Sequence, residues 1–179
     1  MKIIVIARTL NEERNIERFC SGYQWADEIL IADGGSSDDT VSKSVNFSNV
    51  QVRSFSKTID MENGIVRNPH GEHLNFLIDW AKDDGADFII HDDVDCFPNY
   101  LVKAYGRQWL EGMGVAGYYF IYLTRLYLYK DQGHFPRMAQ PIKRGRWEQG
   151  LWAWDANAPL RFKEDIPANE HQQFAWTPP

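Results

Sequence analysis

The chain has 179 residues, a formal net charge of −6 and a hydrophobic fraction of 44%. This length fits one domain with a substantial core, and the negative charge argues against a broad nucleic-acid-binding surface. Cys20 and Cys96 lack metal-ligand spacing and fit reduced core residues better than a disulfide framework. We find no stretch with the length and apolarity of a transmembrane helix or a signal peptide, and we expect a cytoplasmic protein.

Four short stretches predict strands, and three of them are apolar runs that predict buried strands; the stretch at 50–55 is predicted as a strand without an unbroken apolar run. They cover residues 3–7, 28–32, 50–55 and 88–91. Helices are predicted between them from apolar residues spaced three or four apart, over 16–23 and 74–81. The pattern Thr9-x-x-Glu12 is typical of a capping box that opens the first helix.

A further helix is expected after Pro98, which suits a first helical turn. Its inner face would consist of Leu101, Val102, Tyr105 and Trp109. Residues 56–69 show no clear period and are expected to form a loop near the ligand. Residues 115–130 fit a strand or a helix equally well, and 131–179 predict short strands and loops that build part of the site.

Alternating strands and helices predict an α/β fold with a mostly parallel central sheet and helices on both faces. We expect a single domain over residues 1–179, with a ligand-binding half at 1–110 and a second half at 111–179. The chain stops at 177–179 without an obvious terminal element, so a further acceptor or membrane segment is left open.

Three carboxylates follow the fourth predicted strand within four positions: Asp92, Asp93 and Asp95. Open α/β sheets bind ligands at the carboxyl ends of their strands, where crowded carboxylates require a counter-charge such as a divalent cation. A solvated acidic loop is the alternative. Thr9, Asn11, Glu12 and Asp33 follow the first two strands at the same edge, where polar groups can bind a nucleotide. Neither the Gly-x-Gly-x-x-Gly fingerprint nor a Walker lysine loop is present, which argues against dehydrogenases and P-loop enzymes.

Together these stretches resemble glycosyltransferase family 2, the nucleotide-sugar enzymes with the GT-A fold. The resemblance lies in IARTLNEERNI (6–16), in ADEILIADGGSSDDT (26–40) and in the strand that ends at Asp92-Asp93-Val94-Asp95. It implies a metal-dependent inverting transferase of hexosyltransferase type, which moves a sugar from a nucleoside-diphosphate donor to a hydroxyl acceptor.

The resemblance assigns roles to these residues. Thr9, Asn11 and Glu12 would hold the nucleotide, and Asp33 would contact its base. Asp93 and Asp95 form the Asp-x-Asp motif that would bind Mn²⁺ or Mg²⁺ bridging the donor diphosphate, with Asp92 competing with Asp95 as the second carboxylate. One departure is Leu74, which stands where family members often have an arginine; Arg67, His70 or His73 could contact phosphate instead.

An inverting transfer also needs a general base for the acceptor hydroxyl. Asp165 is the first choice, and Glu164, Glu148 and Asp155 are the other candidates. His171 could be a further metal or phosphate ligand, and His134 is a weaker candidate.

The basic cluster at residues 143–147 could bind the diphosphate or an anionic acceptor, or be a solvated loop. Lys143 replaces the glutamine of the Gln-x-x-Arg-Trp motif found in processive members, so processivity is not supported. Two other readings compete: a catalytically weak nucleotide-sugar-binding protein, and, less favoured, a sugar nucleotidyltransferase, whose glycine-rich basic loop is missing. The sequence does not name the sugar, the base or the acceptor, which could be a saccharide, lipid-linked or other.

Overall fold

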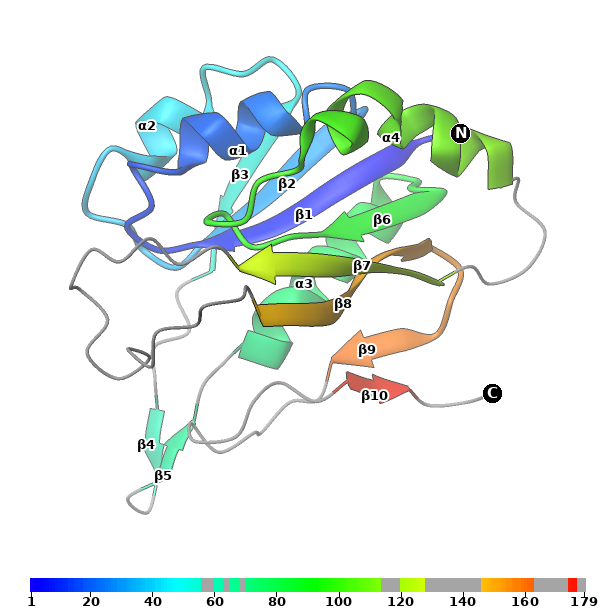
Figure 1. Ribbon diagram of the computed structural model, residues 1–179. Coiled ribbons are helices and arrows are strands. Elements are labelled where there is room, and N and C mark those ends of the chain that lie inside the picture. The colour runs from blue at the N-terminus through cyan, green and yellow to red at the C-terminus, as the bar shows by residue number, and fades with distance from the viewer. Residues whose placement is uncertain are drawn as a thin grey trace.

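The structure is a computed structural model that describes residues 1–55, 60–62, 65–67, 70–113, 120–127, 146–162 and 174–176. Side chains are described within 1–55, 71–112 and 153–162. Ten strands and four helices lie in these segments (Figure 1), in the order β1 (Ile3–Thr9), α1 (Ile16–Gly22), β2 (Glu28–Asp33), α2 (Thr40–Ser44), β3 (Val50–Ser54), β4 (Asp60–Glu62), β5 (Ile65–Arg67), α3 (His70–Asp83), β6 (Phe88–His91), α4 (Tyr100–Met113), β7 (Phe120–Tyr127), β8 (Arg146–Asp155), β9 (Leu160–Phe162) and β10 (Phe174–Trp176).

A six-stranded sheet forms the centre of the fold, with the strand order β3-β2-β1-β6-β8-β7. The neighbours β3, β2, β1 and β6 are parallel, whereas β8 is antiparallel to both β6 and β7. Strand β7 therefore points the same way as the parallel strands, and only β8 runs against them. The α/β fold with a mostly parallel sheet is confirmed.

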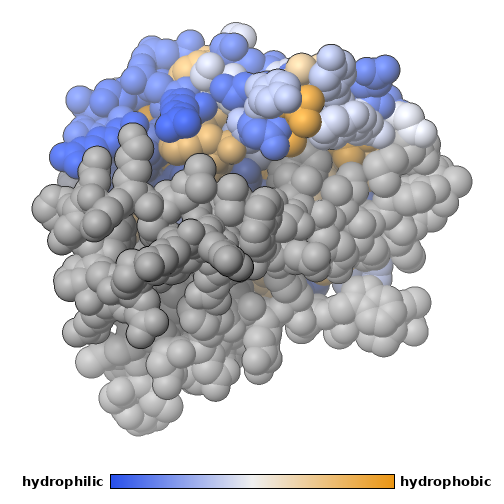
Figure 2. All heavy atoms as spheres, viewed as in Figure 1, coloured by the Kyte–Doolittle hydropathy of each residue, from blue (hydrophilic) through white to orange (hydrophobic). Residues whose placement is uncertain are grey.

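Alternate residues of the strands pack into two separate cores, one on each face of the sheet. Ile3, Val5 and Ala7 of β1 face a core that includes residues of α1 and α4, and Ile4 and Ile6 face a core built on α3. This arrangement gives helices on both faces (Figure 1). Because side chains on a strand point to opposite faces in turn, continuous apolar runs are what a sheet covered on both faces requires. The outer surface over α1 and α2 is hydrophilic (Figure 2).

The face that α4 buries differs from the prediction. Leu101, Tyr105 and Trp109 are 39%, 47% and 45% exposed, whereas Val102 and Leu110 are buried. Gly106 lies between these two on the same face, and a Cβ placed there would come within 2.6 Å of the Trp25 ring. Helix α4 therefore packs against Trp25 through the small residue Gly106, and its large aromatic side chains face outward. The prediction assigns these aromatic residues to the buried face.

Two other predictions of local structure are wrong. Thr9 does not cap a helix: it ends β1, its hydroxyl bonds Asp33, and α1 begins only at Ile16. The predicted loop at 56–69 contains an antiparallel hairpin of β4 and β5. Residues 120–127, which fitted strand and helix equally, form β7. Within the described part of the chain, no helix has both the length and the apolarity needed to span a membrane.

Candidate active site at the carboxyl edge of the sheet

The carboxyl ends of β1, β2 and β6 lie side by side, as the parallel register requires. Thr9 pairs with Asp33, and Ile6 pairs with His91, the last residue of β6. The chain segments that follow these strands, including the acidic turn at 92–95, therefore start from one edge of the sheet. Three sequence stretches that are far apart along the chain converge there.

Asp33 is the hydrogen-bonding centre of the first half of this edge. Its Oδ1 accepts bonds from the hydroxyls of Thr9 (3.0 Å) and Ser36 (2.5 Å), and its Oδ2 accepts from the backbone N–H groups of Gly35 (3.0 Å) and Ser36 (2.9 Å). Burial alone would raise the pKa of Asp33, but the bonds from Ser36, Gly35 and Thr9 outweigh it and keep the pKa below its usual value. Asp33 is thus a buried carboxylate held in its ionised form.

Asn11 and Glu12 hold two loops together. Asn11 has a φ of 55°, a left-handed conformation that asparagine tolerates better than most residues. Its N–H donates to Ser36 Oγ and its Oδ1 accepts from the Ser37 N–H, each at 2.9 Å. The Glu12 carboxylate accepts a bond from Asn15 Nδ2 at 2.8 Å. The Glu12 N–H donates to Thr40 Oγ1 at 2.7 Å, so both residues link the loops after β1 and β2. Their predicted contact with a nucleotide remains a prediction.

Strand alternation separates the three aspartates after β6. Phe88 and Ile90 face the core on the α1 side, and Asp92 continues that face: it is 5% exposed, and its Oδ2 accepts a 2.6 Å bond from the Tyr23 hydroxyl. Asp93 lies on the other side, with its Oδ1 3.9 Å from His91 Nε2. The carboxylate of Asp92 is therefore turned into the protein interior and away from the other two.

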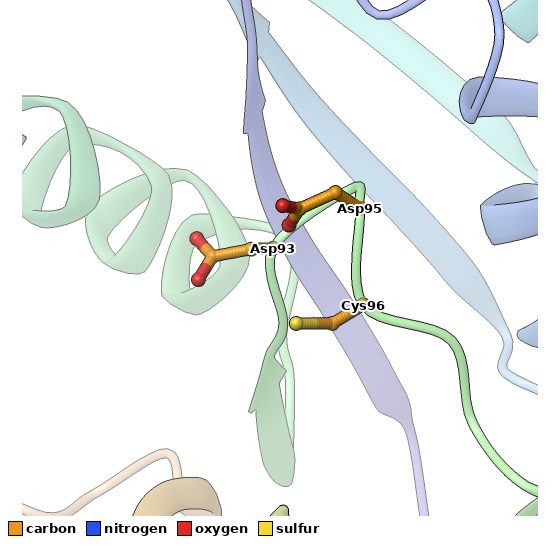
Figure 3. Close-up of side chains that lie close together, drawn as sticks. All are labelled: Asp93, Asp95 and Cys96. Carbon is orange, nitrogen blue, oxygen red and sulfur yellow. The ribbon is translucent and has the colours of Figure 1, made fainter. Parts of the chain in front are cut away.

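The side chains of Asp93, Asp95 and Cys96 project to the same side of the turn after β6 (Figure 3). Each offers one ligand atom, and these three atoms all lie within 4.8 Å of one another. The Cys96 N–H donates to the Asp93 carbonyl at 2.8 Å, which closes the turn. Two carboxylates suit a hard divalent cation such as Mn²⁺ or Mg²⁺, and a neighbouring thiolate would extend the range to softer ions. The residues present therefore fit a metal, with Asp93 and Asp95 as the pair that converges.

The residues considered for phosphate binding have different surroundings. His73 is 8% exposed, its Nε2 lies 3.1 Å from the Phe55 carbonyl, and burial lowers its pKa against the opposing effect of that hydrogen bond. Leu74, which stands in the place of the expected arginine, is fully buried in the core on the α3 face. The backbone of Arg67 ends β5 and that of His70 begins α3, and both side chains lie outside the described residues.

The candidates for the general base fall in three places. Asp155 pairs with Phe88 at the start of β6, is 3% exposed, and accepts bonds from the backbone and side chain of Asn157. It lies at the opposite edge of the sheet, and we drop it as a candidate. The backbone of Glu148 lies on β8, beyond the residue that pairs with Ile90 and thus toward the carboxyl edge. Asp165, Glu164, His171 and His134 lie outside the described residues, as does most of the basic cluster at 143–147.

Two residues of this edge were missed by sequence reasoning. Cys96 was taken as a core residue, although its position directly after Asp95 could have suggested a ligand. Arg8 stands in β1 between Ala7 and Thr9, and its partial burial beside the acidic turn becomes apparent only from the structure.

The chain is similar to several solved structures. Residues 1–349 of S. aureus TarS align with 63% of this chain and 33% of their own, at 22% identity and a TM-score of 0.47. Glucosyl-3-phosphoglycerate synthase (GpgS) from Mycobacterium tuberculosis, in complex with Mg²⁺ and UDP, aligns with 65% of this chain and 40% of its own, at 27% identity and a TM-score of 0.45. This chain thus spans well under half the length of either. No protein family and no curated protein matches the chain.

Proposed function

We propose that this protein is a metal-dependent inverting glycosyltransferase of the hexosyltransferase type, which uses a nucleoside-diphosphate sugar and a hydroxyl acceptor. The observation that carries the proposal is the convergence of Asp93 and Asp95 at the sheet edge where Asp33 is held ionised. The three motifs that resemble glycosyltransferase family 2 supply these same residues. The sequence motifs and the arrangement of the side chains therefore support one site.

In this proposal Asp33 accepts hydrogen bonds from the donor's base, while Asp93 and Asp95 hold Mn²⁺ or Mg²⁺. When bound, the ion acts as a Lewis acid that neutralises charge on the leaving diphosphate. The general base takes the proton of the acceptor hydroxyl, whose oxygen forms a bond to the anomeric carbon as the bond to the diphosphate breaks. Asp165 is our first choice for this base, followed by Glu164 and Glu148.

The first donors to test are UDP sugars. GpgS has been solved with Mn²⁺, UDP-glucose and phosphoglyceric acid, so UDP-glucose and a small phosphorylated hydroxyl acid are reasonable first probes for this chain. Saccharide and lipid-linked acceptors form the second group.

The deciding experiment is a calorimetric titration with UDP, GDP, CDP and ADP, each with and without Mn²⁺. We expect one nucleotide to bind in a Mn²⁺-dependent manner, and Asp93→Asn and Asp95→Asn to abolish that dependence. Asp39→Asn is the matched control, because Asp39 occupies the N-cap position of α2, where its side chain makes no capping hydrogen bond, and it is not part of the acidic turn. Absence of binding by any nucleotide would rule out the proposal.

A second candidate is a nucleotide-sugar-binding protein that lacks transferase activity. The position of Asp155 at the opposite sheet edge favours it, since this removes one of four candidate bases. Slow hydrolysis of a bound sugar donor separates the two: turnover by the wild type that is lost in Asp165→Ala indicates an enzyme. Metal-dependent binding without any turnover, with every acceptor class tried, indicates a binding protein.

A further inference from the structure

Arg8 lies on β1 beside the acidic turn. Ile6 of β1 pairs with His91 of β6, so continuing both chains by two residues brings Arg8 to the level of Asp93. Arg8 also follows Ile4 and Ile6 on the face of the sheet that α3 covers, and His91 and Asp93 follow Ile89 on that face. Asp93 lies two residues beyond the end of β6, so the register places Arg8 at the edge where the acidic turn begins, and the electrostatic effect of Asp93 and Asp95 on Arg8 places its charge near both carboxylates.

The Arg8 side chain is partly buried, and one of its donors lacks a partner within the part of the chain that the structure describes. Its Nε is inaccessible to solvent and makes no hydrogen bond within the described residues. We also find no ion pair of Arg8 in that part of the chain. Burial lowers the pKa of Arg8, and the charges of Asp93 and Asp95 act against this effect. The cation is thus close enough to attract both carboxylates, and within the described residues its Nε–H donates to no acceptor.

Arg53 provides an internal comparison. It lies in the same row of the sheet as Arg8, because Arg8 pairs with Ala32 and Ala32 pairs with Arg53. The guanidinium of Arg53, however, stacks on the Trp80 ring at 3.9 Å from its centroid. Of these two arginines in one row, Arg53 therefore stacks on an aromatic ring, whereas Arg8 lies within the electrostatic reach of Asp93 and Asp95.

We propose that Arg8 binds the diphosphate oxygens of the nucleotide and thereby couples nucleotide binding to metal binding at Asp93 and Asp95. This inference rests on the proposed function. A guanidinium presents paired N–H donors that match phosphate oxygens, and such charge-assisted bonds are stronger than neutral ones. Without a nucleotide, the same positive charge opposes the approach of a divalent cation to the carboxylates. A bound diphosphate places negative charge between the Arg8 guanidinium and the metal ion. Each cation then attracts the diphosphate, and this attraction outweighs the repulsion between the cations.

The coupling must be reciprocal, because metal and nucleotide affinities are linked through one free energy. Removing the Arg8 charge should therefore change the two affinities in opposite directions. In Arg8→Met, Mn²⁺ alone should bind several-fold more tightly. UDP at saturating Mn²⁺ should bind about tenfold or more weakly, as expected for the loss of a charged hydrogen bond. A merely structural role for Arg8 would weaken both.

Isothermal titration calorimetry with Mn²⁺ alone, and with UDP at saturating Mn²⁺, measures both affinities. If UDP is not the nucleotide that binds, the one identified by the titration above replaces it. Arg53→Met is the matched control and should equal the wild type in both titrations. Equal Mn²⁺ affinity in Arg8→Met and wild type, or equal nucleotide affinity, would overturn the inference.

Arg8→Lys keeps the charge and loses the paired donors, so it tests the inference even if Arg8→Met does not fold. Its affinity for Mn²⁺ alone should match the wild type, and its nucleotide affinity should fall several-fold. Nucleotide affinity equal to that of the wild type would contradict diphosphate binding by Arg8. If the wild type binds no nucleotide, the proposed function fails, and the titration with Mn²⁺ alone still reports whether the Arg8 charge acts on the carboxylates.

Discussion

The Tyr23 hydroxyl donates a 2.6 Å hydrogen bond to Asp92 Oδ2 across the interface between α1 and the turn after β6. Both side chains are buried, so the bond gives one of three neighbouring aspartates a structural role. This leaves Asp93 and Asp95 as the pair whose carboxylates converge. The hydrogen bond from Tyr23 thus makes Asp92 the weakest of the three candidates for metal binding.

Replacing Tyr23 with phenylalanine should lower the free energy of unfolding by about 1–3 kcal/mol, because a buried carboxylate oxygen loses its donor. Urea denaturation measures this loss. Tyr105→Phe is the control: Tyr105 is 47% exposed, and its hydroxyl should contribute about 0.5 kcal/mol or less. Equal losses in the two variants would contradict a special role for the Tyr23 bond.

Asp33→Asn should make stability depend less on pH in the acid range. The pKa of Asp33 is lowered in the folded protein, so its carboxylate stabilises the fold fully above the unfolded value of about 3.9. This stabilisation is lost as the pH falls through the folded-state pKa. The difference between wild type and variant, about 1–3 kcal/mol near neutral pH, should therefore shrink below about pH 4.

Urea denaturation at pH 7 and at pH 3 checks this prediction, with Asp39→Asn as the control from the same loop. Asp27 and Asp38 also have lowered pKa values, so some acid sensitivity should persist in Asp33→Asn. A stability difference that is the same at both pH values would show that the Asp33 charge does not contribute.

Gly106→Ala should destabilise the protein by about 1–3 kcal/mol, because the new methyl group would overlap the rigid Trp25 ring. Gly112→Ala in the same helix is the opposite case. Among the described residues, a Cβ at Gly112 would meet no atom within 4 Å apart from its chain neighbours and its own helix backbone, so the helix propensity of alanine should add up to about 1 kcal/mol of stability. Thermal melting curves of both variants should move in opposite directions. A gain in both would mean that α4 shifts to accommodate the methyl group.

The two cysteines should differ in reactivity toward the thiol reagent DTNB. Cys20 is fully buried, and burial raises its pKa to about 12, so it should react only on unfolding. Cys96 is partly exposed in the acidic turn and should react in the native protein. One thiol should therefore react quickly, and none in Cys96→Ser. Mn²⁺ or Cd²⁺ should slow the reaction if the ion binds beside Cys96, whereas an unchanged rate would place the ion elsewhere.

Strands β1, β2 and β6 were predictable because each is buried on both faces and therefore reads as a short apolar run. The convergence of Asp33 with the acidic turn also followed from the sequence, since parallel strands bring their carboxyl ends to one edge. The aromatic stripe of α4 misled the prediction: whether Tyr105 or Gly106 faces the sheet depends on the shape of Trp25, which comes from another part of the chain.

The sequence by itself determined the α/β class, the order of the first elements and the acidic and polar residues at the site, because periodicity and turn chemistry are local properties. Only the tertiary structure decided how these residues are used. In the structure the Thr9 hydroxyl donates to Asp33 and does not cap a helix. Asp155 lies at the edge opposite the site, and the Arg8 charge lies near Asp93. Each of these outcomes depends on strand register, which joins residues distant in sequence and which no local pattern records.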